Sequence, residues 1–201
     1  MAILVWRVIM MLKRRRLKKT DYRQRLRLLS SGRIRLVVRR RHDNVHIQFV
    51  KYETKGDRTL VEEISKSIRK FGWKAHCSSM PAAYLTGLLA GRKALQKGIK
   101  DCVADIGLHA TTSSVLYAAV KGVIDAGINV PMGFGLKEER VKGAHTAEYA
   151  RLLKKDSEKY RRQFSHYTKT GFDPEGMVQH FEEVKAGIMK SFPEKRSVEA
   201  E

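Results

Sequence analysis

The chain has 201 residues, a hydrophobic fraction of 42% and two cysteines, which fits one compact domain with extensions and excludes a disordered tail protein or a disulfide-built scaffold. A formal charge of +20 and a pI near 10.2 favour a polyanionic partner, with nucleic acid ahead of an anionic membrane surface. The first twelve residues are apolar apart from Arg7, but a membrane span needs about 20 residues, and we expect a cytoplasmic protein.

The excess charge is concentrated in one stretch, Lys13 to Arg41, which holds fourteen Lys or Arg and a single acid, Asp21. A run of this kind is usually a solvated face or a disordered tail. Here it continues through a helical segment into a strand, and basic side chains on ordered elements form a fixed surface that suits a polyphosphate. The stretch therefore predicts RNA binding.

The helical segment is predicted to begin with Thr20 as its N-cap and Asp21 in its first turn. Its apolar residues Tyr22, Leu26 and Leu29 recur at i, i+4 and i+7, the spacing of one helix face.

Three strands are predicted over residues 34–40, 45–52 and 59–63, and a turn at residues 42–44 makes the first two a hairpin. Strict alternation in the second strand separates the side chains of its two faces. One face carries Val45, Ile47 and Phe49, and the other carries His46, Gln48, Val50 and Tyr52.

The strongest helix begins at Pro81, and its small residues predict a close approach to a sheet. It ends in the pair Gly98-Ile99, and a second helix ends in the same way at Gly127-Ile128, before a short strand at residues 129–131. Between them, Cys102 to Ile106 is an apolar run typical of a strand covered on both faces. Helices that alternate with buried strands predict right-handed crossovers onto a mixed sheet, and hence an α/β fold.

From Lys137 the chain is polar and helical, with helices predicted over residues 144–163 and 175–189. The predicted organisation is a basic N-terminal arm (1–19), an α/β RNA-binding core (20–136) and a C-terminal helical extension (137–201).

An enzyme is the main alternative. Asp105 lies at the end of a buried strand and could hold Mg²⁺, but a two-metal nuclease needs several converging carboxylates, and the first strand offers only arginines. A Mg-dependent nuclease or nucleotide-binding enzyme on a similar α/β core stays open, as does a basic protein that binds anionic membranes through its apolar N-terminus. We expect Asp105 to be a hydrogen-bonded structural acid, and we predict no enzymatic activity, no metal and no cofactor.

The candidate RNA-binding residues combine charge with aromatic and amide groups. Tyr22, His46 and Tyr52 are suited to stack on unpaired bases and Gln48 to bond a base edge or a 2′-hydroxyl, although simple packing explains the two tyrosines equally well. Six cations of the arm are expected to become ordered between RNA segments: Lys13, Arg14, Arg15, Arg16, Lys18 and Lys19. The arginines expected to bind phosphates after it are Arg23, Arg25, Arg27, Arg33, Arg35, Arg39, Arg40 and Arg41.

Six ordered blocks between residues 13 and 192 resemble the ribosomal protein family numbered eighteen in the large subunit, in its longer archaeal-type version. The blocks are KTDYRQRLRLL, SGRIRLVVRR, PAAYLTGLLAGRKAL, DIGL, KGVIDAGINVP and GAHTAEYA. The resemblance implies a three-layer α/β/α fold with a mixed sheet and a structural, non-catalytic role on the ribosome. It also implies that the chain holds 5S rRNA in the central protuberance, beside the large-subunit rRNA and neighbouring ribosomal proteins, with no membrane partner. The chain departs from the family at Ser78-Ser79, where Gly-Asn is usual.

Overall fold

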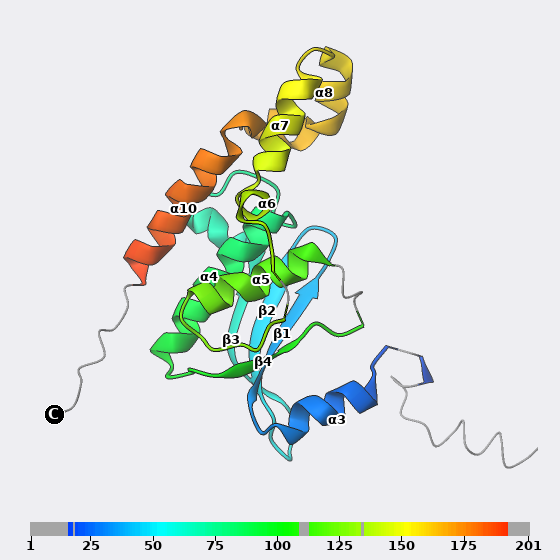
Figure 1. Ribbon diagram of the computed structural model, residues 1–201, viewed down its shortest axis with the longest axis vertical. Coiled ribbons are helices and arrows are strands. Elements are labelled where there is room, and N and C mark those ends of the chain that lie inside the picture. Colours follow the sequence, from blue (N-terminus) through cyan, green and yellow to red (C-terminus); the bar gives the residue numbers. More distant parts are fainter. Residues whose placement is uncertain (1–15, 18, 109–112, 134, 193–201) are drawn as a thin grey trace, which may run out of the picture.

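The computed structural model describes residues 16–17, 19–108, 113–133 and 135–192, and a four-stranded mixed sheet lies at its centre (Figure 1). The strands, in the spatial order β3-β2-β1-β4, are β1 (Ile34–Arg40), β2 (Val45–Lys51), β3 (Arg58–Ile64) and β4 (Cys102–Asp105). Strands β1, β2 and β3 pair antiparallel, whereas β4 pairs parallel with β1. The predicted α/β fold with a mixed sheet is confirmed.

One face of the sheet is covered by α4 (Met80–Gln96) and α5 (Ser114–Asp125) and forms the main core. The side chains that β1 and β2 direct into this core are fully buried: Leu36, Val38, Val45, Ile47 and Phe49. His46 and Gln48 lie on the opposite face and are half-buried. The predicted alternation of β2 is therefore confirmed, because a shift by one residue would exchange the two faces.

Helices α4 and α5 meet backbone to backbone at two glycines. A Cβ atom on Gly87 would lie 2.0 Å from the carbonyl oxygen of Ala119, and one on Gly122 would lie 2.2 Å from the carbonyl oxygen of Tyr84. The small residues of α4 were predicted to allow a close approach to a sheet. Helix α4 does pack on the sheet, with Ala83 and Ala90 in the main core, but Gly87 faces α5 instead.

Both helices end as the sequence predicts. The Ile99 N–H donates to the Ala94 carbonyl at 3.0 Å, and the Ile128 N–H donates to the Val123 carbonyl at 3.4 Å. The glycine before each isoleucine has a positive φ, 78° at Gly98 and 107° at Gly127, which favours a residue without a side chain. The strand predicted at residues 129–131 is reduced to an isolated bridge between Asp101 and Asn129. Strand β4 is half-exposed at Val103 and Ala104, so it is not covered on both faces as predicted.

The C-terminal part is helical, as predicted, but it is more divided. Its elements are α6 (Glu138–Lys142), α7 (Ala144–Leu153), α8 (Ser157–Gln163), α9 (Ser165–Thr170), the 3-10 turn η2 (Pro174–Gly176) and α10 (Met177–Ser191). The single helix predicted over residues 144–163 breaks because Asp156 caps a new helix, its Oδ1 accepting from the Lys159 N–H at 3.2 Å. Helices α7 and α8 project beyond the body of the molecule (Figure 1).

Helix α10 packs on the side of α4 that faces away from the sheet, and it encloses a second core. Phe181, Val184 and Ile188 of α10 are buried there, and the Phe181 ring lies 5.5 Å from the Tyr84 ring between centroids. A 3-10 helix, η1 (Ser65–Phe71), ends at Gly72 and borders this second core through Ile68.

Helix α3 (Tyr22–Ser30) lies on the other side of the sheet and has no buried residue. Its N-cap is Asp21 and not the predicted Thr20: Oδ1 of Asp21 accepts from the N–H groups of Arg23 at 2.9 Å and Gln24 at 3.2 Å. A carboxylate also interacts favourably with the helix dipole, which a threonine hydroxyl does much less.

Candidate nucleic-acid interface

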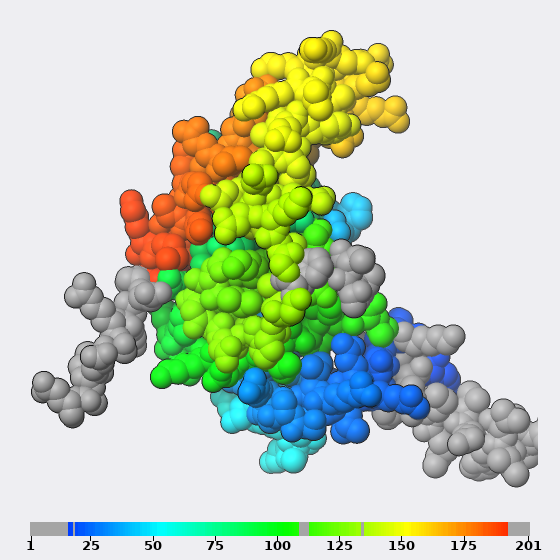
Figure 2. All heavy atoms as spheres, in the orientation of Figure 1, coloured from blue at the N-terminus to red at the C-terminus, as the bar shows by residue number. Residues whose placement is uncertain are grey.

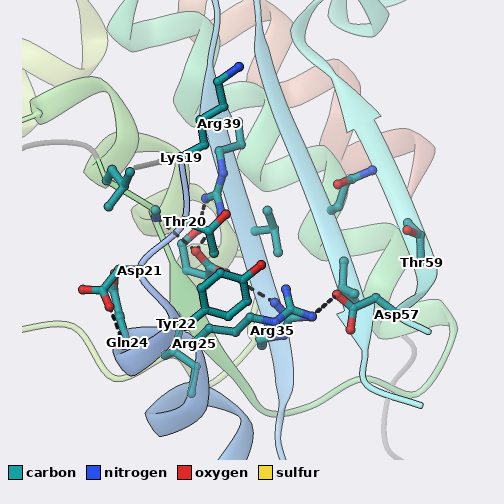
Figure 3. A pocket seen from close by; sticks show the side chains of 17 residues that line it. Lys19, Thr20, Asp21, Tyr22, Gln24, Arg25, Arg35, Arg39, Asp57 and Thr59 are labelled. Carbon is teal, nitrogen blue, oxygen red and sulfur yellow. Dashed lines mark hydrogen bonds and ion pairs between the residues drawn. The ribbon is translucent and has the colours of Figure 1, made fainter. Parts of the chain in front are cut away.

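The sheet face opposite the core and helix α3 enclose an open cavity of about 940 Å³ (Figure 3). Strand alternation directs Arg35, Val37 and Arg39 of β1 toward it, and β2 adds Gln48 and Val50. The remaining lining residues come from the start of the described chain, α3, the β2–β3 turn and the end of β4: Lys19, Thr20, Asp21, Tyr22, Gln24, Arg25, Leu28, Asp57, Thr59, Asp105, Gly107 and Leu108.

Asp105 binds two arginines at the end of β4. Its Oδ1 lies 2.8 Å from Arg39 Nη2 and accepts from the Gly107 N–H at 3.0 Å, while its Oδ2 lies 3.4 Å from Arg35 Nη1. The Asp105 carbonyl accepts a further bond from Arg39 Nη1 at 2.5 Å. Asp105 is thus the hydrogen-bonded structural acid that the sequence predicts. Within the described ranges, no three His, Cys, Asp or Glu side chains form a group that could hold a metal ion.

Asp57 connects α3 to the sheet. Its Oδ2 lies 2.7 Å from Arg25 Nη2 and 2.7 Å from Arg35 Nη2. Burial alone would raise the pKa of Asp57, but the hydrogen bonds from Arg25 and Arg35 outweigh it and hold the pKa below its ordinary value. Arg35 is only 2% exposed, so these carboxylates compensate a buried charge.

The predicted arginines therefore divide into two groups. Arg25, Arg35 and Arg39 are bound by carboxylates, and Arg40 Nε donates to Ser78 Oγ at 3.3 Å. Among the residues that the structure describes, the other predicted cations are exposed and their side chains have no ion pair: Arg16, Lys19, Arg23, Arg27, Arg33 and Arg41. Arg23 and Arg27 are four residues apart and therefore share one side of α3. Lys13, Arg14, Arg15 and Lys18 lie outside the described residues.

The predicted base-contacting residues have different surroundings. His46 Nε2 lies 2.5 Å from Glu62 Oε1, and hydrogen bonds from His46 and then Gln48 lower the pKa of Glu62. Tyr22 is half-buried and lines the cavity, whereas Tyr52 is 53% exposed and does not line it. Tyr22 and Gln48 therefore line the same cavity, whereas His46 and Tyr52 do not.

Two further features of the surface were not predicted. The ion pairs of Asp57 are one of them, although an acid between two strands, beside an arginine-rich hairpin, is a signal for an ion pair. The unusual Ser78-Ser79 pair is structural: Ser79 Oγ caps α4 by accepting from the Ala82 N–H at 3.4 Å, and Ser78 Oγ donates to the Arg41 carbonyl at 3.3 Å.

A second basic surface lies on α7, α8 and α9, at the opposite end of the long axis from α3 (Figure 2). Lys154 is paired with Glu175, and Lys159 with Asp156. The other Lys and Arg side chains of these helices and of the link between α7 and α8 are exposed, and no ion pair joins them to another described residue: Arg151, Lys155, Arg161, Arg162 and Lys169. Few apolar side chains lie among these cations, and one of them, Leu152, is 71% exposed.

Comparison with known proteins agrees with the nucleic-acid partner that the basic surface indicates. Residues 7–101 match the profile of the family described as "Ribosomal large subunit proteins 60S L5, and 50S L18". The chain is also similar to a protein of Methanococcus maripaludis named "Large ribosomal subunit protein uL18", with 47% identity over 180 residues that cover 88% of this chain and 93% of the relative. None of the helices in the described ranges is long and apolar enough to cross a membrane.

Proposed function

Since this chain belongs to the family of large ribosomal subunit protein uL18, we propose that it binds 5S rRNA and attaches that RNA to the large rRNA in the central protuberance. Family membership confirms the prediction of a ribosomal protein with a structural role, and not an enzymatic one. Ribosomal RNA and other ribosomal proteins are therefore its partners.

The observation that carries the proposal is the group of uncompensated cations on and beside α3. Arg23, Arg27 and Arg33 are exposed and unpaired within the described chain, so their guanidinium groups are available for bidentate contacts with phosphates. Asp57 and Asp105 hold Arg35 and Arg39 of the sheet in place. A surface whose charged side chains are already held in place loses less conformational freedom when RNA binds. We assign 5S rRNA to this surface.

The attachment to the large rRNA requires a second surface, and the cations of α7, α8 and α9 supply one. Arg161 and Arg162 lie on α8, far from α3 along the length of the molecule (Figure 2). Two basic surfaces at opposite ends are suited to bridge two RNA segments, whereas one continuous surface would hold only one.

Salt dependence of binding tests this assignment, because the logarithm of the affinity falls with the logarithm of the salt concentration in proportion to the phosphates neutralised. In the Arg23→Ala/Arg27→Ala variant we expect the slope on 5S rRNA to become shallower by about 1.4–1.8 units, at roughly 0.7–0.9 per lost contact. The matched control is Arg161→Ala/Arg162→Ala, which removes the same charge and should leave the slope on 5S rRNA unchanged.

The same two variants should exchange roles when the probe is a fragment of the large rRNA from the central protuberance. Transfer RNA serves as the competitor in each titration. Equal affinity of the unmodified protein for tRNA and 5S rRNA would contradict the 5S assignment. Equal effects of the two variants on both RNAs would contradict the two-surface arrangement.

A further inference from the structure

The cavity between α3 and the sheet has the dimensions and walls of a ligand pocket. Its volume of about 940 Å³ lies at the upper end of the roughly 300–1,000 Å³ that such pockets usually have. Val37 and Val50 form an apolar floor on the sheet, and Leu28 adds an apolar wall from α3. In Figure 3 the ring of Tyr22 projects from the start of α3 into the space over β1.

The charges around the cavity are nearly balanced, which argues against a phosphate inside it. Four cations and three carboxylates line the cavity, and Arg25, Arg35 and Arg39 are each already paired with Asp57 or Asp105. A phosphate in the cavity would lie close to both of these carboxylates and would be repelled. A neutral, flat chemical group would not be repelled by these carboxylates.

Polar groups with remaining hydrogen-bonding capacity line the same walls. Gln48 and the Thr59 hydroxyl offer donors and acceptors at the floor and rim.

We propose that this cavity receives one unpaired nucleotide of the bound RNA, inserted with its base first. The base would stack on the Tyr22 ring, lie over Val37 and Val50, and bond the Gln48 amide through its polar edge. The phosphates on either side would remain outside, near the unpaired cations of α3. The inference rests on the proposed binding of RNA and adds to it a site of different chemistry.

A variant that fills the cavity tests the proposal. Thr59 is exposed on β3, where an aromatic residue suits a strand, so Thr59→Trp should fold and occupy the space. We expect its affinity for 5S rRNA to fall about 10-fold or more, because stacking of one base on an aromatic ring contributes enough for such a loss. The salt slope should not change, since no phosphate contact is removed. Thr54→Trp is the matched control, because Thr54 is exposed in the same hairpin but does not line the cavity, and it should bind as the unmodified protein does.

Tyr22 provides a test that does not depend on a larger side chain. Tyr22→Phe keeps the ring and should bind normally, whereas Tyr22→Ala should lose about as much affinity as Thr59→Trp. Chemical probing of the bases gives an independent readout. At least one base of 5S rRNA that is reactive in the free RNA should be protected in the complex and should become reactive again with Thr59→Trp.

The outcomes separate the pocket from the proposed function. If the unmodified protein does not bind 5S rRNA, the proposed function and the pocket are both overturned. If it binds, but Thr59→Trp and Tyr22→Ala bind equally well and protect the same bases, the pocket alone is overturned. Unchanged RNA binding together with lost binding of a neighbouring ribosomal protein would assign the cavity to a peptide segment instead.

Discussion

At the scale of single residues, Asp57 has a larger role than its position in a turn indicates. It is the point where α3, the β2–β3 turn and the start of β1 are joined, because its carboxylate binds Arg25 and Arg35 at 2.7 Å each. Arg35 has a second partner, Asp105, at the longer distance of 3.4 Å. Removal of Asp57 would therefore leave a buried guanidinium with one weak partner.

We predict that Asp57→Asn lowers the free energy of unfolding by about 1–2 kcal/mol at pH 7, a value reduced for the partial exposure of Asp57. The pKa of Asp57 is lower in the folded than in the unfolded state, so its contribution is complete above the unfolded value of 3.8 and is lost as the pH falls through the folded value. The difference between variant and unmodified protein in urea unfolding should accordingly shrink below about pH 4.

Asp43→Asn is the control for this prediction. Among the described residues Asp43 is paired with His42 alone, whose side chain is 99% exposed, so its substitution should change stability little. An Asp57→Asn protein as stable at pH 7 as the Asp43→Asn protein would show that α3 is held without this carboxylate.

At the scale of elements, the contact between α4 and α5 depends on two residues without side chains. Only glycine fits at Gly87, because a Cβ atom would overlap the Ala119 carbonyl oxygen of α5. The two helices are thus closer than ordinary side-chain packing allows, and a methyl group must push them apart.

We predict that Gly87→Ala destabilises the protein by about 3 kcal/mol, at the upper end of the usual cost of overpacking. Gly187→Ala in α10 is the matched control. Its Cβ meets nothing within 4 Å, so it should stabilise the protein by about 0.5–1 kcal/mol through the higher helix propensity of alanine. Thermal and urea unfolding of the two variants measure both values, and equal stability of the two would show that α5 can shift without cost.

The attachment of α10 also contains a titratable group, His180. Its ring stacks on Trp73 at 5.1 Å, and its Nε2 accepts from the Lys74 N–H at 3.1 Å, which requires an unprotonated nitrogen. Burial lowers the pKa of His180 from its ordinary value of 6.5, Lys74 adds to this, and Glu183 opposes it. The neutral ring therefore stabilises the fold above about pH 6.5, and this contribution is lost as the pH falls through the folded pKa.

We predict that the melting temperature of the unmodified protein decreases on acidification below about pH 6.5, and that His180→Phe reduces this decrease. Phenylalanine keeps the stacking on Trp73 but cannot titrate. Acidification should also destabilise the protein through His76, because burial and the neighbouring His166 lower the pKa of His76 too. Part of the pH dependence should therefore remain in the variant. A pH profile unaffected by His180→Phe would contradict the prediction.

At the scale of the whole molecule, the sequence predicts the features that depend on neighbouring residues. Alternation predicted the buried face of β2, and the pairs Gly98-Ile99 and Gly127-Ile128 predicted two helix ends. The ion pairs of Arg35 could not be predicted, because Asp57 and Asp105 reach it only after β1 has paired with β2 and β4. The sequence shows which side of α4 carries Gly87, but the element that packs against that side depends on the tertiary packing. The cavity likewise exists only once α3 lies over the sheet.

The position of α4 between two cores has a consequence for the order of synthesis. One side of this helix faces α5 and the sheet, and the other is covered by α10, whose last residue is Ser191. A growing chain is made from its N-terminus at about 5–20 residues per second, so the side of α4 that α10 covers lacks this cover until residue 191 has been synthesised. A nascent chain that stops before α10 would therefore present an apolar helix surface to chaperones and proteases, and the cell would remove incomplete copies before they compete for RNA.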